Sequence, residues 1–101
     1  MKITKEINNG VITLSLEGKL DTITSPELDK ALKLELEHAE NVVMDFSKLL
    51  FVTSAGLRVL LEGHKAAEAK GSSMKLKNVG NDVMEVLEIT GLTGVFSFEE
   101  G

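Results

Sequence analysis

The chain has 101 residues, of which 43% are hydrophobic and 27% charged, and its formal net charge is -5 at pH 7. This balance predicts a globular protein with one domain, residues 1–101, and excludes a disordered chain. The negative charge disfavours nonspecific binding to nucleic-acid phosphates or to anionic lipid surfaces, so we expect no nucleic-acid partner.

Further function classes are excluded by what the sequence lacks. Without cysteine, the chain has no disulfide framework and no thiolate chemistry. No apolar stretch approaches the ~18 residues of a membrane-spanning helix, so we expect no membrane insertion. The first ten residues lack the apolar core of a signal peptide. We therefore expect a soluble protein of the cytoplasm.

Two strands are expected first in chain order. Residues 2–7 and residues 11–16 flank the sequence Asn-Asn-Gly, a strong signal for a tight β-hairpin. In the second segment Ile12, Leu14 and Leu16 alternate with less apolar residues. This alternation predicts a strand with one buried face.

A polar loop and a first helix follow. Ser25 is a credible N-cap, and Pro26 and Glu27 suit the first helical turn. The apolar residues that would line the buried stripe of this helix are Leu28, Ala31, Leu32 and Leu36. The acidic segment 35–40 is expected to face water, with His38 as a solvated residue near the end of the helix.

The second half of the chain alternates strands and helices. Residues 41–46 predict a short strand that ends at Asp45, and its continuous apolar run indicates burial on both faces. A second helix, ended by Gly71, is predicted from the helical spacing of Leu57, Leu60, Leu61, His64 and Ala67. A strand over residues 74–79, a third helix within residues 80–92 and a possible edge strand over residues 95–98 complete the pattern.

The order of these elements defines the fold class. It is β-β-α-β-α-β-α, with a possible last strand, and such alternation predicts an α/β fold. We expect a mixed β-sheet with a parallel centre, packed with about three to four α-helices.

The sequence Thr-Ser-Ala-Gly, residues 53–56, lies where an apolar run ends and the second helix begins. Ser54 would then stand at or near a helix N-terminus, where its hydroxyl can cap the helix, bind an anion or accept a phosphoryl group. From the local pattern alone, an N-cap is the favoured role of Ser54, with Thr53 as the last residue of the strand.

Catalysis by Ser54 is disfavoured. The G-x-S-x-G pattern of a nucleophile elbow is absent, and neither His38 nor His64 is placed to act as its base. Two separated histidines without cysteine make no metal-ligand cluster. We expect no catalytic residues, no metal site and no cofactor.

The sequence VVMDFSKLLFVTSAGLRVLL resembles the signature of the STAS domain, typified by bacterial anti-sigma factor antagonists. The matching positions include Asp45, Ser47, Ser54, Gly56 and Leu57. The sequence GKLDTITSPELDKAL resembles the family's first loop and helix, and ITGLTGVFSF resembles its closing segment. The resemblance covers essentially the whole chain and implies a STAS-like fold.

The resemblance also implies a binding switch and not an enzyme. The serine that corresponds to Ser54 is phosphorylated by a partner that is both anti-sigma factor and serine kinase, and a PP2C-type phosphatase reverses this. The unphosphorylated form binds the partner and thereby regulates transcription that depends on the sigma factor. The partner-binding residues implied in this chain are Asp21, Thr22, Thr24, Ser25, Thr53, Ser54, Ala55, Gly56 and Leu57.

Two positions depart from the family pattern. Many antagonists have Asp directly before the phosphorylated serine, where this chain has Thr53, so Thr53 is an alternative acceptor. Ala55 replaces a second serine, which limits the acceptors to Ser54 and Thr53. The alternative function is a non-phosphorylated STAS adaptor subunit of a lipid-transport or other multi-protein assembly. The sequence indicates neither an oligomeric state nor a particular sigma factor.

Overall fold

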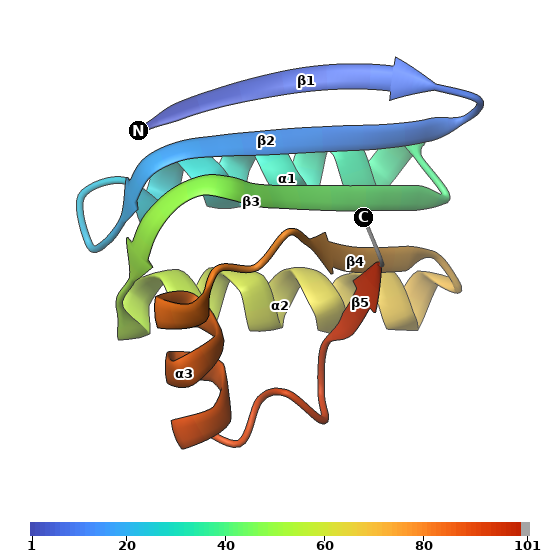
Figure 1. Cartoon of the computed structure of the whole chain (residues 1–101). Helices are drawn as coiled ribbons and strands as arrows, with labels where there is room; N and C mark the ends of the chain where they lie inside the picture. Colours follow the sequence, from blue (N-terminus) through green and yellow to red (C-terminus); the bar gives the residue numbers. More distant parts are fainter. Residues whose placement is uncertain (100–101) are drawn as a thin grey trace.

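The computed structural model describes residues 1–99, and Figure 1 shows how the chain is arranged. The last two residues of the predicted domain lie outside the described residues. The elements follow the predicted order, including the last short strand. They are β1 (Lys2–Asn8), β2 (Val11–Leu20), α1 (Ser25–His38), β3 (Asn41–Val52), α2 (Ser54–Lys70), β4 (Ser73–Lys77), α3 (Asn81–Ile89) and β5 (Ser97–Glu99).

The strands form one mixed sheet in the order β1-β2-β3-β4-β5. β1 pairs with β2 antiparallel, and each later strand is parallel to the strand before it. The hairpin between β1 and β2 closes through Asn9 and Gly10, both with positive φ, as a primed two-residue turn requires. The predicted mixed sheet with a parallel centre is confirmed.

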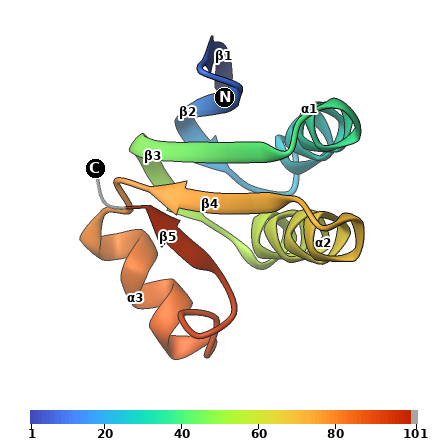
Figure 2. The same cartoon turned by 90° about the vertical axis from the view of Figure 1, so that its right-hand side faces the viewer.

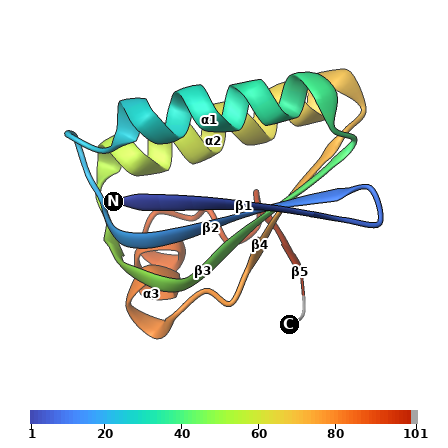
Figure 3. The same ribbon diagram turned by 90° about the horizontal axis from the view of Figure 1, so that it is seen from above.

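Helices cover the two faces of the sheet unequally. α1 and α2 lie side by side on one face, and α3 lies on the opposite side near β4 and β5 (Figures 2 and 3). Within residues 1–99, no helix covers β1 and β2 on that opposite face, whereas α3 also contacts β3. Val42, Val43 and Met44 of β3 are all buried, because elements pack against both faces of this central strand. Their continuous apolar run predicted this burial.

The core lies between the sheet and the pair α1 and α2, and it extends to Val83 and Leu87 of α3. Leu28, Leu32 and Leu36 of α1 are buried, whereas Ala31 is only partly so. The buried stripe of α2 includes Leu57, Leu60 and Ala67, with Leu61 and His64 half-buried beside it. The helical spacing therefore identified the inward face of both helices.

β3 is longer than predicted. It does not end at Asp45 but continues to Val52. Ser15 pairs with Asp45 and Glu17 with Lys48, so two steps along β2 match three along β3. Such a β-bulge bends the strand and breaks the two-residue alternation by which a strand is identified.

Two expectations at α1 are wrong. Thr24, and not Ser25, is the N-cap, because the carbonyl oxygen of Thr24 already accepts the first helical bond, from the N–H of Leu28 at 3.3 Å. The acidic segment does not face water throughout. Glu35 is buried and forms an ion pair with Lys5 of β1, at 3.0 Å, since α1 lies over that strand.

Candidate functional site

Two loops meet at one end of the sheet. β2 ends at Leu20 and β3 at Val52, and these two residues are paired neighbours in parallel strands. The N–H of Thr53 extends this pairing by donating to the carbonyl oxygen of Leu20, at 3.0 Å. The loop before α1 and the first turn of α2 therefore lie together, on the left in Figure 1. The structure brings the two predicted site segments into one place.

The loop from Asp21 to Thr24 is held by its own side chains. One carboxylate oxygen of Asp21 accepts the N–H groups of Ile23 and Thr24, each at 3.0 Å. The hydroxyl of Thr24 accepts the N–H of Asp21 at 2.9 Å and donates to the carbonyl oxygen of Lys19 at 2.8 Å. The hydroxyl of Ser25 donates to the carbonyl oxygen of Asp21. These three side chains thus shape the loop from within.

Asp21 is ionised more readily than an ordinary aspartate. The N–H of Thr24 is the main cause, and although desolvation opposes it, the N–H of Ile23 and the positive charge of Lys19 also lower the pKa of Asp21. The carboxylate therefore stays charged at neutral pH and keeps the loop ordered. Thr22 and Ile23 remain exposed at the tip.

The two hydroxyls of Thr-Ser-Ala-Gly differ in accessibility. Thr53 is the N-cap of α2, with extended backbone and without a side-chain capping bond, so the expectation that Ser54 is the cap is wrong. The Oγ1 atom of Thr53 is buried and has no hydrogen-bond partner within residues 1–99. Ser54 is the first helical residue and is exposed. Of the two predicted acceptors, Ser54 is the exposed residue, whereas the hydroxyl oxygen of Thr53 is buried.

Gly56 and Leu57 serve the core and not the surface. Both are buried. A Cβ atom at Gly56 would lie 2.6 Å from Cγ of Leu20 and 2.8 Å from Cγ2 of Val52, too close for either to remain in place. The absence of a side chain thus lets α2 begin directly against the ends of β2 and β3. Ala55 is half-buried between this contact and the surface.

The sequence analysis did not predict the exposed apolar side chains at this end of the sheet. Ile23 at the loop tip is 87% exposed, and Phe51, three residues before Ser54, is 39% exposed. The Nζ atom of Lys19 lies 5.7 Å from the centre of the Phe51 ring. The sequence did contain one indication of such a residue, because Ile23 stands between two threonines and belongs to no helical or strand pattern. We call the exposed residues Thr22, Ile23, Phe51 and Ser54 the Ser54 surface.

The histidines are engaged elsewhere. His64 meets the ring of Phe96 edge-on, with 5.8 Å between centroids, and its Nε2 lies 3.9 Å from Glu68. His38 ends α1, whereas the Ser54 surface lies at the start of that helix. Within residues 1–99, no group of three or more His, Cys, Asp or Glu side chains could hold a metal ion.

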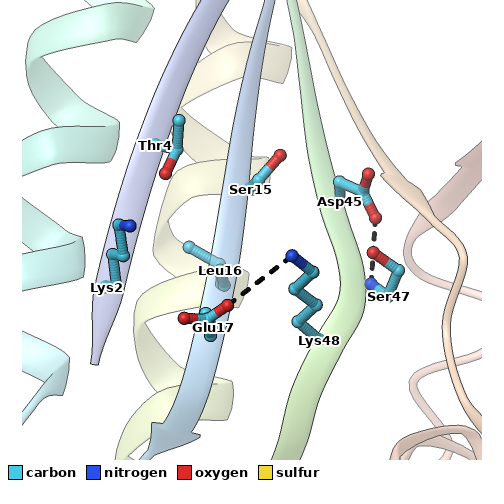
Figure 4. A pocket seen from close by; sticks show the side chains of 8 residues that line it. All are labelled: Lys2, Thr4, Ser15, Leu16, Glu17, Asp45, Ser47 and Lys48. Atoms are coloured by element: carbon cyan, nitrogen blue, oxygen red, sulfur yellow. Dashed lines mark hydrogen bonds and ion pairs between the residues drawn. The ribbon is translucent and has the colours of Figure 1, made fainter.

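A separate depression lies on the open face of the sheet, and Figure 4 shows the side chains around it. Its volume is about 310 Å³, and Lys48 pairs there with Glu17 at 3.7 Å. Asp45 accepts the N–H of Ser47 at 2.9 Å and a side-chain N–H of Asn78 at 3.1 Å. Partial burial opposes ionisation of Asp45, but these bonds and the charge of Lys77 outweigh it and lower its pKa. Asp45 thus fixes the bulge and the end of β4.

Residues 2–100 match the STAS domain family. The chain belongs to this family. Among its relatives, the anti-sigma F factor antagonist of Paenibacillus polymyxa is 31% identical, over 91% of this chain and 80% of the relative. The anti-sigma-F factor antagonist RsfB of Mycobacterium tuberculosis is 30% identical, over 93% of this chain and 77% of the relative.

A solved structure has the same fold. The Bacillus cell fate determinant SpoIIAA in its phosphorylated form matches with a TM-score of 0.78 and 17% identity, over 99% of this chain and 91% of that one. At this identity the match shows the STAS fold alone. In the part of the chain that the structure describes, no helix is long and apolar enough to cross a membrane.

Proposed function

We propose that this STAS domain is an anti-sigma factor antagonist that binds an anti-sigma factor while Ser54 is unphosphorylated and is released when Ser54 is phosphorylated. The antagonists of Paenibacillus polymyxa and Mycobacterium tuberculosis support the class of function. One observation carries the proposal for this chain. The exposed hydroxyl of Ser54 stands on the same end of the sheet as the exposed apolar residues Ile23 and Phe51.

Accessibility decides between the two hydroxyls. A kinase must place the acceptor oxygen in its active site, and the Oγ1 atom of Thr53 is buried. Ser54 is exposed on the first turn of α2. We therefore assign the phosphoryl group to Ser54, and we assign to Thr53 the N-cap position in place of the aspartate that the family pattern has there.

Charge alone is enough to operate the switch. Phosphorylation adds about 1.5 to 2 negative charges and three acceptor oxygens. Within an apolar interface formed by Ile23 and Phe51, this added charge would have to be desolvated, which opposes binding. A loss of about 3 kcal/mol of binding free energy weakens binding roughly a hundredfold. No change of fold is required.

The partners follow from the same reaction. A serine kinase, which is the anti-sigma factor itself, would add the phosphate, and a PP2C-type phosphatase would remove it. All of these would act in the cytoplasm. The domain is then the substrate of two enzymes and not an enzyme, in keeping with the separation of Ser54 from both histidines within the described residues.

The test combines phosphorylation and binding. The chain captures its partner from native extract, and the purified partner with ATP then modifies the wild type and two variants, Ser54→Ala and Thr53→Val. Mass spectrometry is expected to place one phosphate on Ser54 in the wild type and in Thr53→Val, and none in Ser54→Ala. Binding of a partner without kinase activity, equal for Ser54→Ala and Ser54→Asp, would instead favour a non-phosphorylated adaptor.

A further inference from the structure

Arg58 lies one helical turn after Ser54. Residues four apart on a helix are neighbours on the same face, and both Ser54 and Arg58 are exposed. Among residues 1–99, no carboxylate lies within ion-pair distance of the Arg58 guanidinium. The first turn of α2 also contains no acidic residue. Within the described part of the chain, Arg58 is therefore a cation without a counter-charge beside the proposed acceptor.

The direction of helical side chains favours contact between these two residues. Each Cα–Cβ bond tilts toward the helix N-terminus, so a long side chain covers the turn before its own Cα atom. This direction allows the long side chain of Arg58 to reach back toward Ser54. An anion four residues before a cation is also the more favourable order. Glu62, four residues after Arg58, offers the less favourable order.

We propose that phosphorylated Ser54 forms an ion pair with Arg58 within α2. The guanidinium presents parallel N–H donors, which match two phosphate oxygens. This inference rests on the proposed function and adds its regulation: Arg58 holds the phosphoryl group against the free domain and gives it a fixed orientation on the Ser54 surface. The same charge that opposes docking thereby stabilises the released form.

Lys19 is another cation at this end of the sheet, and its position differs. Its ammonium group lies over the Phe51 ring, and it belongs to β2 and not to the helix that carries Ser54. A contribution from general positive charge would involve Lys19 as much as Arg58. The two sites can therefore be separated by single substitutions.

The test uses phosphoserine inserted at position 54 during translation, so that no kinase is needed. Phosphorus NMR follows the second ionisation of the phosphate at low ionic strength in the wild type, Arg58→Gln, Lys19→Gln and Lys65→Gln. Lys65 is an exposed cation further along α2 and serves as the matched control. Arg58→Gln is expected to raise the midpoint by about 0.5 pH unit, because the ion pair favours the dianion.

The outcomes separate this inference from the proposed function. A rise confined to Arg58→Gln, and abolished in 1 M NaCl, supports the ion pair. Equal midpoints for Arg58→Gln and Lys65→Gln would overturn it, and so would an equal rise for Lys19→Gln. Since the phosphate is installed without a kinase, failure of a kinase to modify Ser54 would contradict the proposed function and leave this result standing.

Discussion

The backbone N–H of Thr53 donates to the carbonyl oxygen of Leu20 at 3.0 Å, and this bond joins two loops that are far apart in the sequence. It prolongs the parallel pairing of β2 and β3 by one step beyond Val52. Since both strands end there, the loop from Asp21 to Thr24 and the start of α2 lie on one surface. The proposed docking site is thus a direct consequence of strand register.

Gly56→Ala should destabilise the domain. The added methyl group would overlap the side chains of Leu20 and Val52, and overpacking of this kind costs about 1 to 3 kcal/mol. The measurement is the free energy of unfolding in urea. Gly94→Ala is the matched control, because a Cβ atom there meets nothing within 4 Å. Equal midpoints for the two variants would contradict the close packing at Gly56.

Asp21→Asn should remove a pH-dependent part of the stability. The pKa of Asp21 is lowered in the folded state, mainly by the N–H of Thr24. Its contribution is therefore complete above the unfolded value of about 3.8 and is lost as the pH falls through the folded pKa. Urea unfolding should separate the wild type from Asp21→Asn at pH 7, and the difference should shrink as the pH falls below 3.8 and through the folded pKa.

The control for this experiment is Glu85→Gln, an exposed carboxylate on α3. It tests whether loss of any one negative charge produces the same change. A difference between the wild type and Asp21→Asn that persists unchanged at low pH would argue against the carboxylate of Asp21 as its source.

Glu35→Ala should loosen β1. The buried carboxylate of Glu35 pairs with Lys5, whose side chain is about half exposed, so solvent screens the pair in part. We expect a loss of about 1 kcal/mol in unfolding free energy and faster amide hydrogen exchange in β1. Glu37→Ala, an exposed neighbour on the same helix, should change neither. Unchanged exchange in β1 would show that the ion pair does not hold the edge strand.

Ile23→Ser should weaken partner binding without affecting stability. Ile23 is 87% exposed in the free domain, so its removal costs the fold little, whereas burial of an isoleucine at an interface contributes about 1.5 kcal/mol or more. Calorimetric titration should show a dissociation constant that is larger by roughly tenfold or more. Ile89→Ser, at an isoleucine 78% exposed on α3, is the matched control and should bind normally.

The sequence predicted most of the fold and the two segments that meet at the candidate site. The Asn-Asn-Gly turn, the apolar run of β3 and the helical spacing in α2 led to the right order of elements, and the motif around Ser54 led to the family. The features that the sequence did not predict depend on contacts between elements that are far apart in the chain. The bulges of β3 place its buried residues Phe46, Leu49 and Val52 three apart, which no strand pattern anticipates.

The other misses have the same origin. Glu35 belongs to an acidic segment and is buried only because α1 lies over β1 and Lys5. The exposure of Ile23 depends on the turn that Asp21 stabilises. Thr53, and not Ser54, is the N-cap of α2, because its carbonyl oxygen accepts the N–H of Leu57 while its own N–H is held by Leu20 of the neighbouring strand.

The most direct test of the account is the affinity of the purified anti-sigma factor for the unmodified domain and for the domain with phosphoserine at position 54. Calorimetric titration should show binding of the unmodified domain and of Ser54→Ala, and roughly hundredfold weaker binding of the phosphorylated domain. Equal dissociation constants for the phosphorylated and unmodified forms would contradict a switch at Ser54.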